Sequence, residues 1–526
     1  MRSRTAVFSL VCVFAFGCSA VLGLGDYGVG ASGTDAGTES GVGPIGIDGG
    51  GANDALADTS ASDTGTTDTG SDVVVSDPCL AENKPQVALV TVEEGDSVTL
   101  DCTKDWILDK PTFVRAGATL TIQPGTTIKA TRGLPEVYST TGMLIVQRGG
   151  KLIADGLRDK PIVFTSVKAP ADRRPADWGG VVLLGKATVN QPGAKLEGVP
   201  SNIPAEDSVE YGGNDDADNS GVLRYVRIEY AGFTIAKDRE INGLTFGGVG
   251  SGTVVDFVQV RLATDDCFEF FGGTVNAKHL ICHYNQDDGF DWDFGYRGKL
   301  QYLILQQDPN FYDDQNGFEG DNASASPAWN LTPFSSPSIA NVTLCGPGKP
   351  TVRPVDDAGT PVTLRRRYGM LVRRRSGVKV LNSIVLGFEG GFNFGGAGAD
   401  TIPGDLDRIE VRNTIFFGNI HAPGAAAGIG NVAFPEVTGG AQFLANDDSS
   451  LDEFARLTDV QFNNVQSDPG IGCGVTNVTN PSFAPSGKLT VPAIDVPGLD
   501  KTDYMGALRD TNDTWATGKW VVWSDK

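Results

Sequence analysis

The sequence TDDCFEFFG at residues 264–272 is followed 22 residues later by QDDGFDWDFG at residues 286–295. A short apolar run precedes each copy, FVQV at 257–260 and HLIC at 279–282, and a third run, YLIL, follows at 302–305. A repeat of this length, made of short strands and turns, is typical of a chain that winds into stacked coils. This stretch therefore predicts a parallel β-solenoid.

The same four-residue run can be aligned along much of the chain. At intervals of 22 to 41 residues, it occurs at 225–228, 257–260, 279–282, 302–305, 341–344, 382–385 and 413–416. The short intervals set the bare coil, and the longer ones indicate loops inserted between strands. A second strand, at 243–246 and again at 369–372, also aligns, so we expect two strands per coil. Asn341, Asn382 and Asn413 open the last three runs and predict a stack of asparagines at one turn.

Composition agrees with an all-β protein and excludes some partners. The chain has 526 residues with 69 glycines, and it lacks long amphipathic helical patterns. Its formal net charge of -23 would repel a phosphate backbone, so nucleic acid is not expected as a partner.

The first residues resemble a bacterial export signal. Arg2 and Arg4 precede the apolar segment 6–16, which is too short to span a membrane. Ala15-Phe16-Gly17-Cys18 resembles a lipobox with Cys18 as the lipidated residue, although Ala15 stands where that pattern prefers leucine. We therefore expect residues 1–18 to be a signal peptide. The protein is then lipid-anchored at the cell envelope, at the outer membrane, or else secreted after cleavage near Gly17.

Two further segments follow the leader. Residues 19–77 are rich in Gly, Ser, Thr, Asp and Ala, a composition that cannot bury enough apolar surface to fold. We expect a disordered tether there and a β-helix domain over 78–526. An even number of cysteines in an exported chain predicts disulfides, and here these are Cys79, Cys102, Cys267, Cys282, Cys345 and Cys473. The positions of these cysteines in the chain favour one disulfide between Cys79 and Cys102 and another between Cys267 and Cys282.

Several of these stretches carry a resemblance to a known group of proteins. The run from 211 to 221 and the run from 268 to 276 resemble an uncharacterised family of exported bacterial surface lipoprotein-like proteins. Residues 162–166 with 177–180, and 504–507 with 515–523, are similar to that family too. The resemblance spans roughly residues 110–526. It implies a right-handed parallel β-helix with inserted loops, and it implies no settled activity.

A ladder of acids is the main candidate for chemistry. Asp265, Asp266 and Glu269 should stack on Asp287, Asp288 and Asp291, with Glu319 as a further rung. Alternation along a strand sends the neighbouring phenylalanines into the core and the acids to one outer face. Stacked like charges need cations, arginines or raised pKa values. In one interpretation, these acids bind Ca²⁺. The metal candidates are Asp215, Asp216, Asp218, Asp265, Asp287 and Asp321.

Two other interpretations compete with calcium binding. Asp266, Glu269, Asp288 and Asp291 are candidates for acid–base cleavage of a polysaccharide by a hydrolase, or by a lyase that uses Arg297 or Lys278 as its base. Alternatively, the acids satisfy backbone N–H groups at turns and pair with arginines such as those of 373–375. We favour ion pairing over ligand binding for that arginine cluster.

Aromatic residues suggest a sugar-binding face. Trp292, Tyr296 and Trp329 are expected at the surface, where their rings could stack on a polysaccharide. The sequence thus favours a cell-surface binding or structural β-helix protein that holds glycan and Ca²⁺ on an acidic, aromatic face. The alternative is a polysaccharide hydrolase or lyase that uses the same acids.

Overall fold

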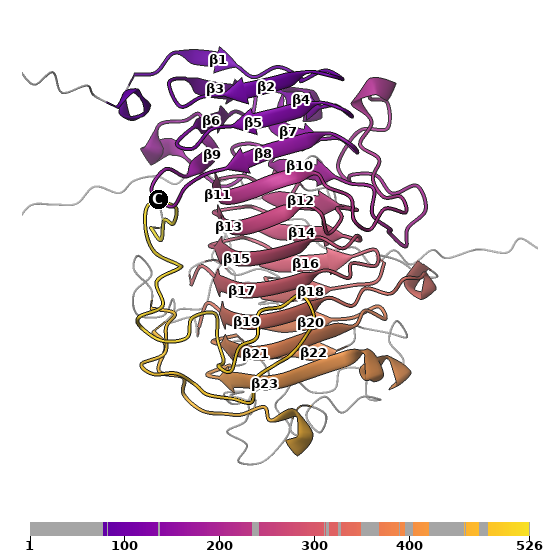
Figure 1. Cartoon of the computed structure of the whole chain (residues 1–526), viewed down its shortest axis with the longest axis vertical. Helices are drawn as coiled ribbons and strands as arrows, with labels where there is room; N and C mark the ends of the chain where they lie inside the picture. The colour runs from indigo at the N-terminus through magenta and orange to yellow at the C-terminus, as the bar shows by residue number, and fades with distance from the viewer. Residues whose placement is uncertain are drawn as a thin grey trace, which may run out of the picture. The chain divides into compact units, whose positions relative to one another are not determined.

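The computed structural model shows a chain wound into a column of stacked coils (Figure 1). It describes residues 77–81, 83–134, 137–233, 241–309, 311, 315–323, 328–348, 368–388, 390–394, 403–419, 457, 459–472 and 482–524. Within these residues no helix is long and apolar enough to cross a membrane. The predicted signal peptide, with Cys18, and all but the last residue of the predicted tether lie outside them.

The regular elements are short strands with a few single-turn 3₁₀ helices. The strands are β1 (Gln86–Ala88), β2 (Ser97–Leu100), β3 (Asp105–Leu108), β4 (Pro111–Val114), β5 (Thr119–Ile122), β6 (Thr127–Ala130), β7 (Met143–Val146), β8 (Lys151–Asp155), β9 (Ile162–Ser166), β10 (Val181–Leu184), β11 (Gly221–Glu229), β12 (Leu244–Gly247), β13 (Val254–Arg261), β14 (Phe268–Phe271), β15 (Asn276–His283), β16 (Phe290–Asp293), β17 (Lys299–Gln306), β18 (Phe318–Gly320), β19 (Ser338–Cys345), β20 (Met370–Val372), β21 (Val378–Leu386), β22 (Asn393–Phe394) and β23 (Ile409–Phe417). The 3₁₀ helices are η1 (Pro78–Leu80), η2 (Tyr138–Thr140), η3 (Pro170–Asp172), η4 (Ala205–Asp207), η5 (Ala328–Asn330), η6 (Pro403–Arg408) and η7 (Val460–Phe462).

All strand pairs within these two sheets are parallel, and each strand pairs with its counterpart one coil away. Within the described residues, one sheet has 14 strands and runs from β1 to β23, and the other has nine and runs from β4 to β22. The chain is a right-handed parallel β-helix, as the sequence predicted. The predicted register is confirmed, since Val226 pairs with Val258 and Val258 with Leu280.

Each coil has three faces, although the sequence suggested two strands per coil. In the first coils the three strands are separate, and both β8 and β9 pair with β11. From β11 onward a single kinked strand spans two faces. The kink is the first residue of the predicted run, where φ lies between 49° and 63° at Tyr225, Phe257, His279, Tyr302, Asn341, Asn382 and Asn413.

The residue at the kink also stacks on its counterparts. Tyr225, Phe257, His279 and Tyr302 form a ring stack with centroids 4.5, 4.1 and 4.7 Å apart. Asparagine tolerates the left-handed backbone better than most residues, and it continues the column. Asn413 Nδ2 donates to Asn382 Oδ1 at 2.9 Å, which confirms the predicted asparagine stack. Between Asn382 and Asn341 the link is Thr502 Oγ1, which donates to Asn341 Oδ1 at 2.7 Å and accepts from Asn382 Nδ2 at 3.3 Å.

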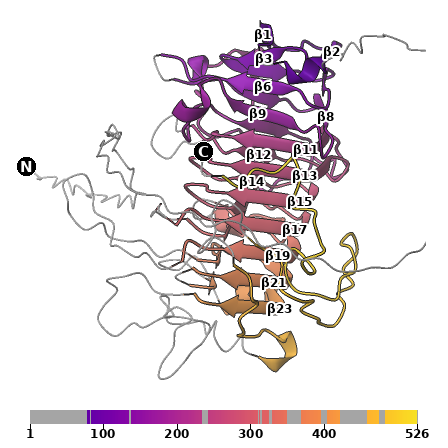
Figure 2. The same ribbon diagram turned by 90° about the vertical axis from the view of Figure 1, so that its left-hand side faces the viewer.

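Thr502 belongs to a C-terminal segment, residues 482–524, that we call the strap. The strap runs along the outside of the 14-stranded sheet (yellow in Figures 1 and 2). Its Met505, Leu508 and Trp520 form one apolar cluster with Ile281, Ile304 and Ile384 of the sheet. Two glutamine side chains each donate one hydrogen bond to the backbone of the strap and accept one from it. Gln259 exchanges bonds of 2.8 and 2.9 Å with Val522, and Gln301 bonds of 3.0 and 2.7 Å with Asp500.

Two disulfides form at the positions that the sequence predicted. Cys79 is bonded to Cys102, and Cys267 to Cys282, which confirms both predicted pairs. Cys345 is also disulfide-bonded, and Cys473 lies outside the described residues.

Candidate functional site

The predicted acid ladder lies on the outer side of the nine-stranded sheet, at β14, β16 and β18. Glu269 pairs in register with Asp291, and Asp291 with Glu319. The alternate residues Phe268, Phe290 and Phe318 point into the core, where the first two rings stack 5.2 Å apart. The side chains therefore alternate as expected, with phenylalanine inward and acid outward.

The acids do not lie on an open surface, and here the structure corrects the sequence-based expectation. We define the acid cluster as Asp265, Asp266, Glu269, Asp287, Asp288, Asp291 and Glu319. Glu269 is only 6% exposed, and Asp266 is equally buried. Loop residues cover the outer face next to them: Leu196, Val209 and Tyr211 pack against Phe271 and the strands below. This loop has no repeat pattern, so its folding back over the sheet was not predicted.

Two of the acids carry out a structural task. Asp266 Oδ1 accepts the N–H of Asp288 at 2.8 Å, and Asp288 Oδ1 accepts the N–H of Asn316 at 2.5 Å. Asn316 Oδ1 continues the series by accepting the N–H of Tyr368 at 2.9 Å. Each side chain thus satisfies a backbone donor of the next coil, which is the turn-capping role considered from the sequence.

Three acids from two adjacent coils meet closely. Asp266, Glu269 and Asp291 each place a carboxylate oxygen within 4.8 Å of the others, and Asp265 with Asp266 and Asp287 forms a second such group. Asp288, Asp291 and Glu319 form a third. Two oxygens that share a Ca²⁺ ion at about 2.4 Å can lie at most about 5 Å apart, so the spacing of each group suits a common ion.

Burial and mutual repulsion make these carboxyl groups hard to ionise together. The pKa of Asp266 is raised well above its usual value by burial and by Asp265 and Asp287. Burial, Glu197 and Asp291 likewise raise the pKa of Glu269. The pKa of Asp291 is raised by burial and by Asp288 and Asp321, against an opposing effect of Arg373. A bound proton or cation would relieve this repulsion.

Two oxygens in the same row have no hydrogen-bond partner among the residues that the structure describes. Asp291 Oδ1 and Thr245 Oγ1 are both buried and unpartnered, and Thr245 lies one coil before Glu269 in strict register. Carboxylate and hydroxyl oxygens are hard ligands of the kind that Ca²⁺ takes. The donor set thus fits a calcium ion. The sequence analysis missed Thr245, although extending the row by one coil would have found it.

The arginine cluster behaves as predicted, and it removes one metal candidate. Arg373 Nε lies 2.9 Å from Asp321 Oδ1, and Arg373 also bonds Glu319. Arg374 Nη1 lies 2.5 Å from Asp321 Oδ2, so two guanidinium groups already neutralise Asp321. Arg375 pairs with the buried Asp405 at 3.2 Å. Arg365, Arg366 and Arg367 lie outside the described residues.

The metal candidates Asp215, Asp216 and Asp218 do not form a close group of three acids within the described residues. Asp215 Oδ1 accepts the N–H of Ala217 at 3.2 Å, and Asp218 Oδ2 accepts the Ser220 hydroxyl at 3.3 Å. Asp216 accepts the N–H of Thr188 at 2.9 Å and pairs with Arg297 at 3.2 Å. These are turn and ion-pair roles.

Neither predicted lyase base is beside the acid cluster. Arg297 is occupied by Asp216, as described above. Lys278 belongs to β15 in the other sheet, where its Nζ lies 2.6 Å from Asp500 of the strap.

Two of the three predicted sugar-stacking residues are core residues. Trp292 is completely buried and donates from Nε1 to Ser376 Oγ at 2.9 Å. Tyr296 is equally buried, donates to Val275 O at 2.9 Å and stacks on Phe270 at 4.7 Å. Trp292 lies two residues from Phe290 on the same strand, so its side chain faces the interior as Phe290 does. Neither the Trp292 ring nor the Tyr296 ring is exposed to a ligand in solution. Trp329 is half-buried in η5.

Comparison with known proteins identifies the family. A family model described as a pectate-lyase-like beta helix domain matches residues 91–468. The chain belongs to this family. The match covers the nine-stranded sheet and the whole acid cluster. No curated protein and no solved structure matches the chain. As a pectate-lyase-like β-helix protein, the chain has a fold that is consistent with a role in polysaccharide binding or processing.

Proposed function

We propose that this protein is an exported, cell-surface polysaccharide-binding β-helix protein whose acid cluster holds Ca²⁺. The observation that carries the proposal is the group formed by Asp266, Glu269 and Asp291, with one oxygen of each within 4.8 Å of the others. The resemblance of residues 1–18 to an export signal, with Cys18 as the lipidation site, is the reason for placing the protein at the cell envelope.

The calcium ion would supply two things at this site. It neutralises carboxylates that otherwise repel one another, and it offers further coordination positions to an anionic ligand, because Ca²⁺ takes six to eight oxygens. The protein residues hold the cluster on three consecutive coils of a stiff sheet. An acidic polysaccharide is the ligand that such a cation would favour.

Cleavage of the polysaccharide at the same acids is the alternative function. One observation favours it: a carboxylic acid with a raised pKa, such as Glu269, next to a second carboxyl group is the arrangement that a hydrolase uses. Burial argues against it, since Glu269, the acid that would protonate the glycosidic bond, is only 6% exposed. Asp287, Asp291 and Glu319 are half-buried, so an ion held at these residues can still be reached by a ligand. We therefore place binding first.

A polysaccharide panel separates the two functions. The exported chain is mixed with acidic and neutral polysaccharides, with Ca²⁺ or with a chelator, and retention, reducing ends and unsaturated products are followed. The proposal predicts Ca²⁺-dependent retention of acidic polysaccharide without turnover, lost in Asp291→Asn and kept in Asp109→Asn, an exposed acid after β3. Turnover that Glu269→Gln abolishes would replace binding by catalysis, and no retention of any polysaccharide would remove both.

A further inference from the structure

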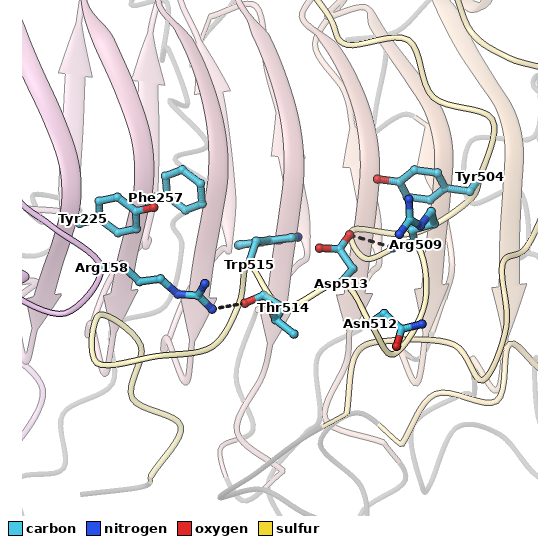
Figure 3. Close-up of a pocket in the computed structure, with 9 residues that line it drawn as sticks. All are labelled: Arg158, Tyr225, Phe257, Tyr504, Arg509, Asn512, Asp513, Thr514 and Trp515. Carbon is cyan, nitrogen blue, oxygen red and sulfur yellow. Dashed lines mark hydrogen bonds between the residues drawn. The ribbon is translucent and has the colours of Figure 1, made fainter. Parts of the chain in front are cut away.

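A separate groove of about 420 Å³ lies between the strap and the ring stack. It is on the side of the 14-stranded sheet, whereas the acid cluster is on the nine-stranded one. Figure 3 shows that the strap supplies most of its residues and that β11 and β13 supply one ring each. The groove is lined by Arg158, Tyr225, Phe257, Tyr504, Arg509, Asn512, Asp513, Thr514 and Trp515. Its volume lies in the range of small-molecule sites.

Aromatic rings form one wall of this groove. Tyr225 and Phe257 are stacked 4.5 Å apart, and Trp515 meets the next ring of the stack, His279, edge-on at 5.0 Å. Tyr225, Phe257 and Trp515 are half-buried, whereas the fourth aromatic residue of the groove, Tyr504, is 9% exposed. Phe257 is stacked between Tyr225 and His279, so the partly open rings are those of Tyr225 and Trp515. Fixed, partly open rings offer an apolar surface to the C–H groups of a sugar ring, at little cost in conformational entropy.

Two arginines lie at opposite ends of the groove (Figure 3). Arg158 Nη2 donates to Thr514 O at 2.6 Å and to Thr517 Oγ1 at 2.9 Å, while its Nη1 has no partner within the described part of the chain. Arg509 pairs through Nε with Asp510 at 3.2 Å, and both its Nη atoms lack partners among those residues. Guanidinium nitrogens of this kind bind carboxylate or sulfate groups.

The charge of the groove differs from that of the protein. The chain carries a formal net charge of -23, yet the groove has two arginines and one acid, Asp513. Asp513 Oδ2 accepts the backbone N–H of Arg509 at 3.2 Å and does not pair with its guanidinium. A neutral sugar would gain little from this arrangement, whereas an anionic one gains both an ion pair and ring contact.

We propose that this groove is a second binding site, specific for a saccharide that carries a carboxylate or a sulfate group. The anionic group binds Arg509 or Arg158, and the sugar ring lies against Trp515 and Tyr225. The inference extends the proposed polysaccharide role to a new surface, but it does not depend on calcium or on the acid cluster.

Calorimetric titration in chelator tests the site on the full exported chain. The probes are a uronic acid oligosaccharide, a sulfated one, a neutral one of equal length and an oligoaspartate peptide. The proposal predicts binding of at least one anionic saccharide, with the neutral saccharide and the peptide at least tenfold weaker. Equal binding of the peptide would reduce the site to charge alone, and absence of saccharide binding would also overturn the proposal.

Point variants locate the binding. Arg509→Gln is expected to weaken it at least tenfold, because Arg509 is exposed and, among the described residues, its guanidinium forms an ion pair with Asp510 alone. Asp513→Asn is expected to strengthen it, since an opposing charge is removed. Arg412→Gln is the matched control: Arg412 is also exposed and paired with one acid, Glu410, at 3.0 Å on β23. Trp515→Leu should weaken binding too, with thermal melting as the check on folding.

Variants at each site test the two proposals independently. Binding in chelator that Asp291→Asn leaves unchanged and Arg509→Gln abolishes supports the groove alone. If Asp291→Asn abolishes saccharide binding and Arg509→Gln has no effect, the groove is not a site and the acid cluster accounts for the binding.

Discussion

His283 and Asn382 show how single side chains support this column. His283 is completely buried on β15 and stacks on Tyr284 at 4.0 Å, and within the described part of the chain neither ring nitrogen has a hydrogen-bond partner. Asn382 holds φ at 53° and bonds both Asn413 and Thr502. The contribution of each residue to the free energy of unfolding can therefore be measured with single variants.

Acid should destabilise the protein through His283. Burial and then Arg261 lower the pKa of His283 well below its ordinary value of 6.5. As the pH falls below 6.5, the unfolded chain takes up a proton that the folded chain cannot. The free energy of unfolding therefore drops by up to about 1.4 kcal/mol per pH unit until the folded pKa is reached. Denaturant unfolding of the parent and of His283→Phe from pH 7 to 5 measures this contribution as the difference between the two slopes, because the raised carboxyl pKa values of the acid cluster add a slope of the opposite sign to both proteins. Equal slopes in the parent and in His283→Phe would refute the assignment.

The asparagine stack makes a second prediction about a residue. Asn382→Ala loses the amide bonds and puts alanine, which tolerates the left-handed region less well than asparagine, at φ 53°, at a cost of about 2–4 kcal/mol in unfolding free energy. Asn382→Gly loses the same bonds but relieves the backbone, so it should cost about 1–2 kcal/mol less than Asn382→Ala. Equal costs of the two variants in urea unfolding would mean that the backbone conformation at residue 382 is unimportant.

Strands could be predicted from the sequence where a repeat or an alternation of residues marks them. The four-residue run gave the register of β11 to β23, because the same row of the coil is occupied in each repeat. The acids and phenylalanines of β14 and β16 were assigned correctly by alternation. The same rule applied to Trp292 would have placed it beside Phe290 in the core. Burial of the acids and the path of the strap were not predictable, since both depend on loops without a period.

The strap is the element whose attachment can be tested most cleanly. Gln259 makes both of its bonds with Val522 from a buried position on β13. Gln259→Leu keeps the side chain's bulk but removes both bonds, so hydrogen exchange of residues 519–524 should become at least tenfold faster. The control is Gln461→Leu, because Gln461 is exposed and bonds only Asp459. Unchanged exchange in Gln259→Leu would show that the packing of Trp520 and the bonds from Arg227 and Arg261 hold this part of the strap without Gln259.

The whole molecule combines a rigid scaffold with two chemically opposite surfaces. Parallel coils stack in register along the entire column, and stability in such a solenoid comes from contacts between neighbouring coils. On one face, carboxyl groups from three consecutive coils gather where they cannot all stay charged. On the other, arginines and open rings lie between the strap and the ring stack. An acidic polysaccharide could use both surfaces, through calcium on the first and directly on the second.

Calcium binding to the acid cluster is the central claim, and a titration of the exported chain with Ca²⁺ tests it most directly. The account predicts saturable binding, a rise in melting temperature with Ca²⁺, and loss of both in Asp291→Asn but not in Asp109→Asn. It also predicts that metal-free Asp291→Asn melts above the metal-free parent, because one repelling buried carboxyl group is gone. Absence of Ca²⁺ binding at millimolar concentration, or binding that Asp291→Asn leaves unchanged, would contradict the account.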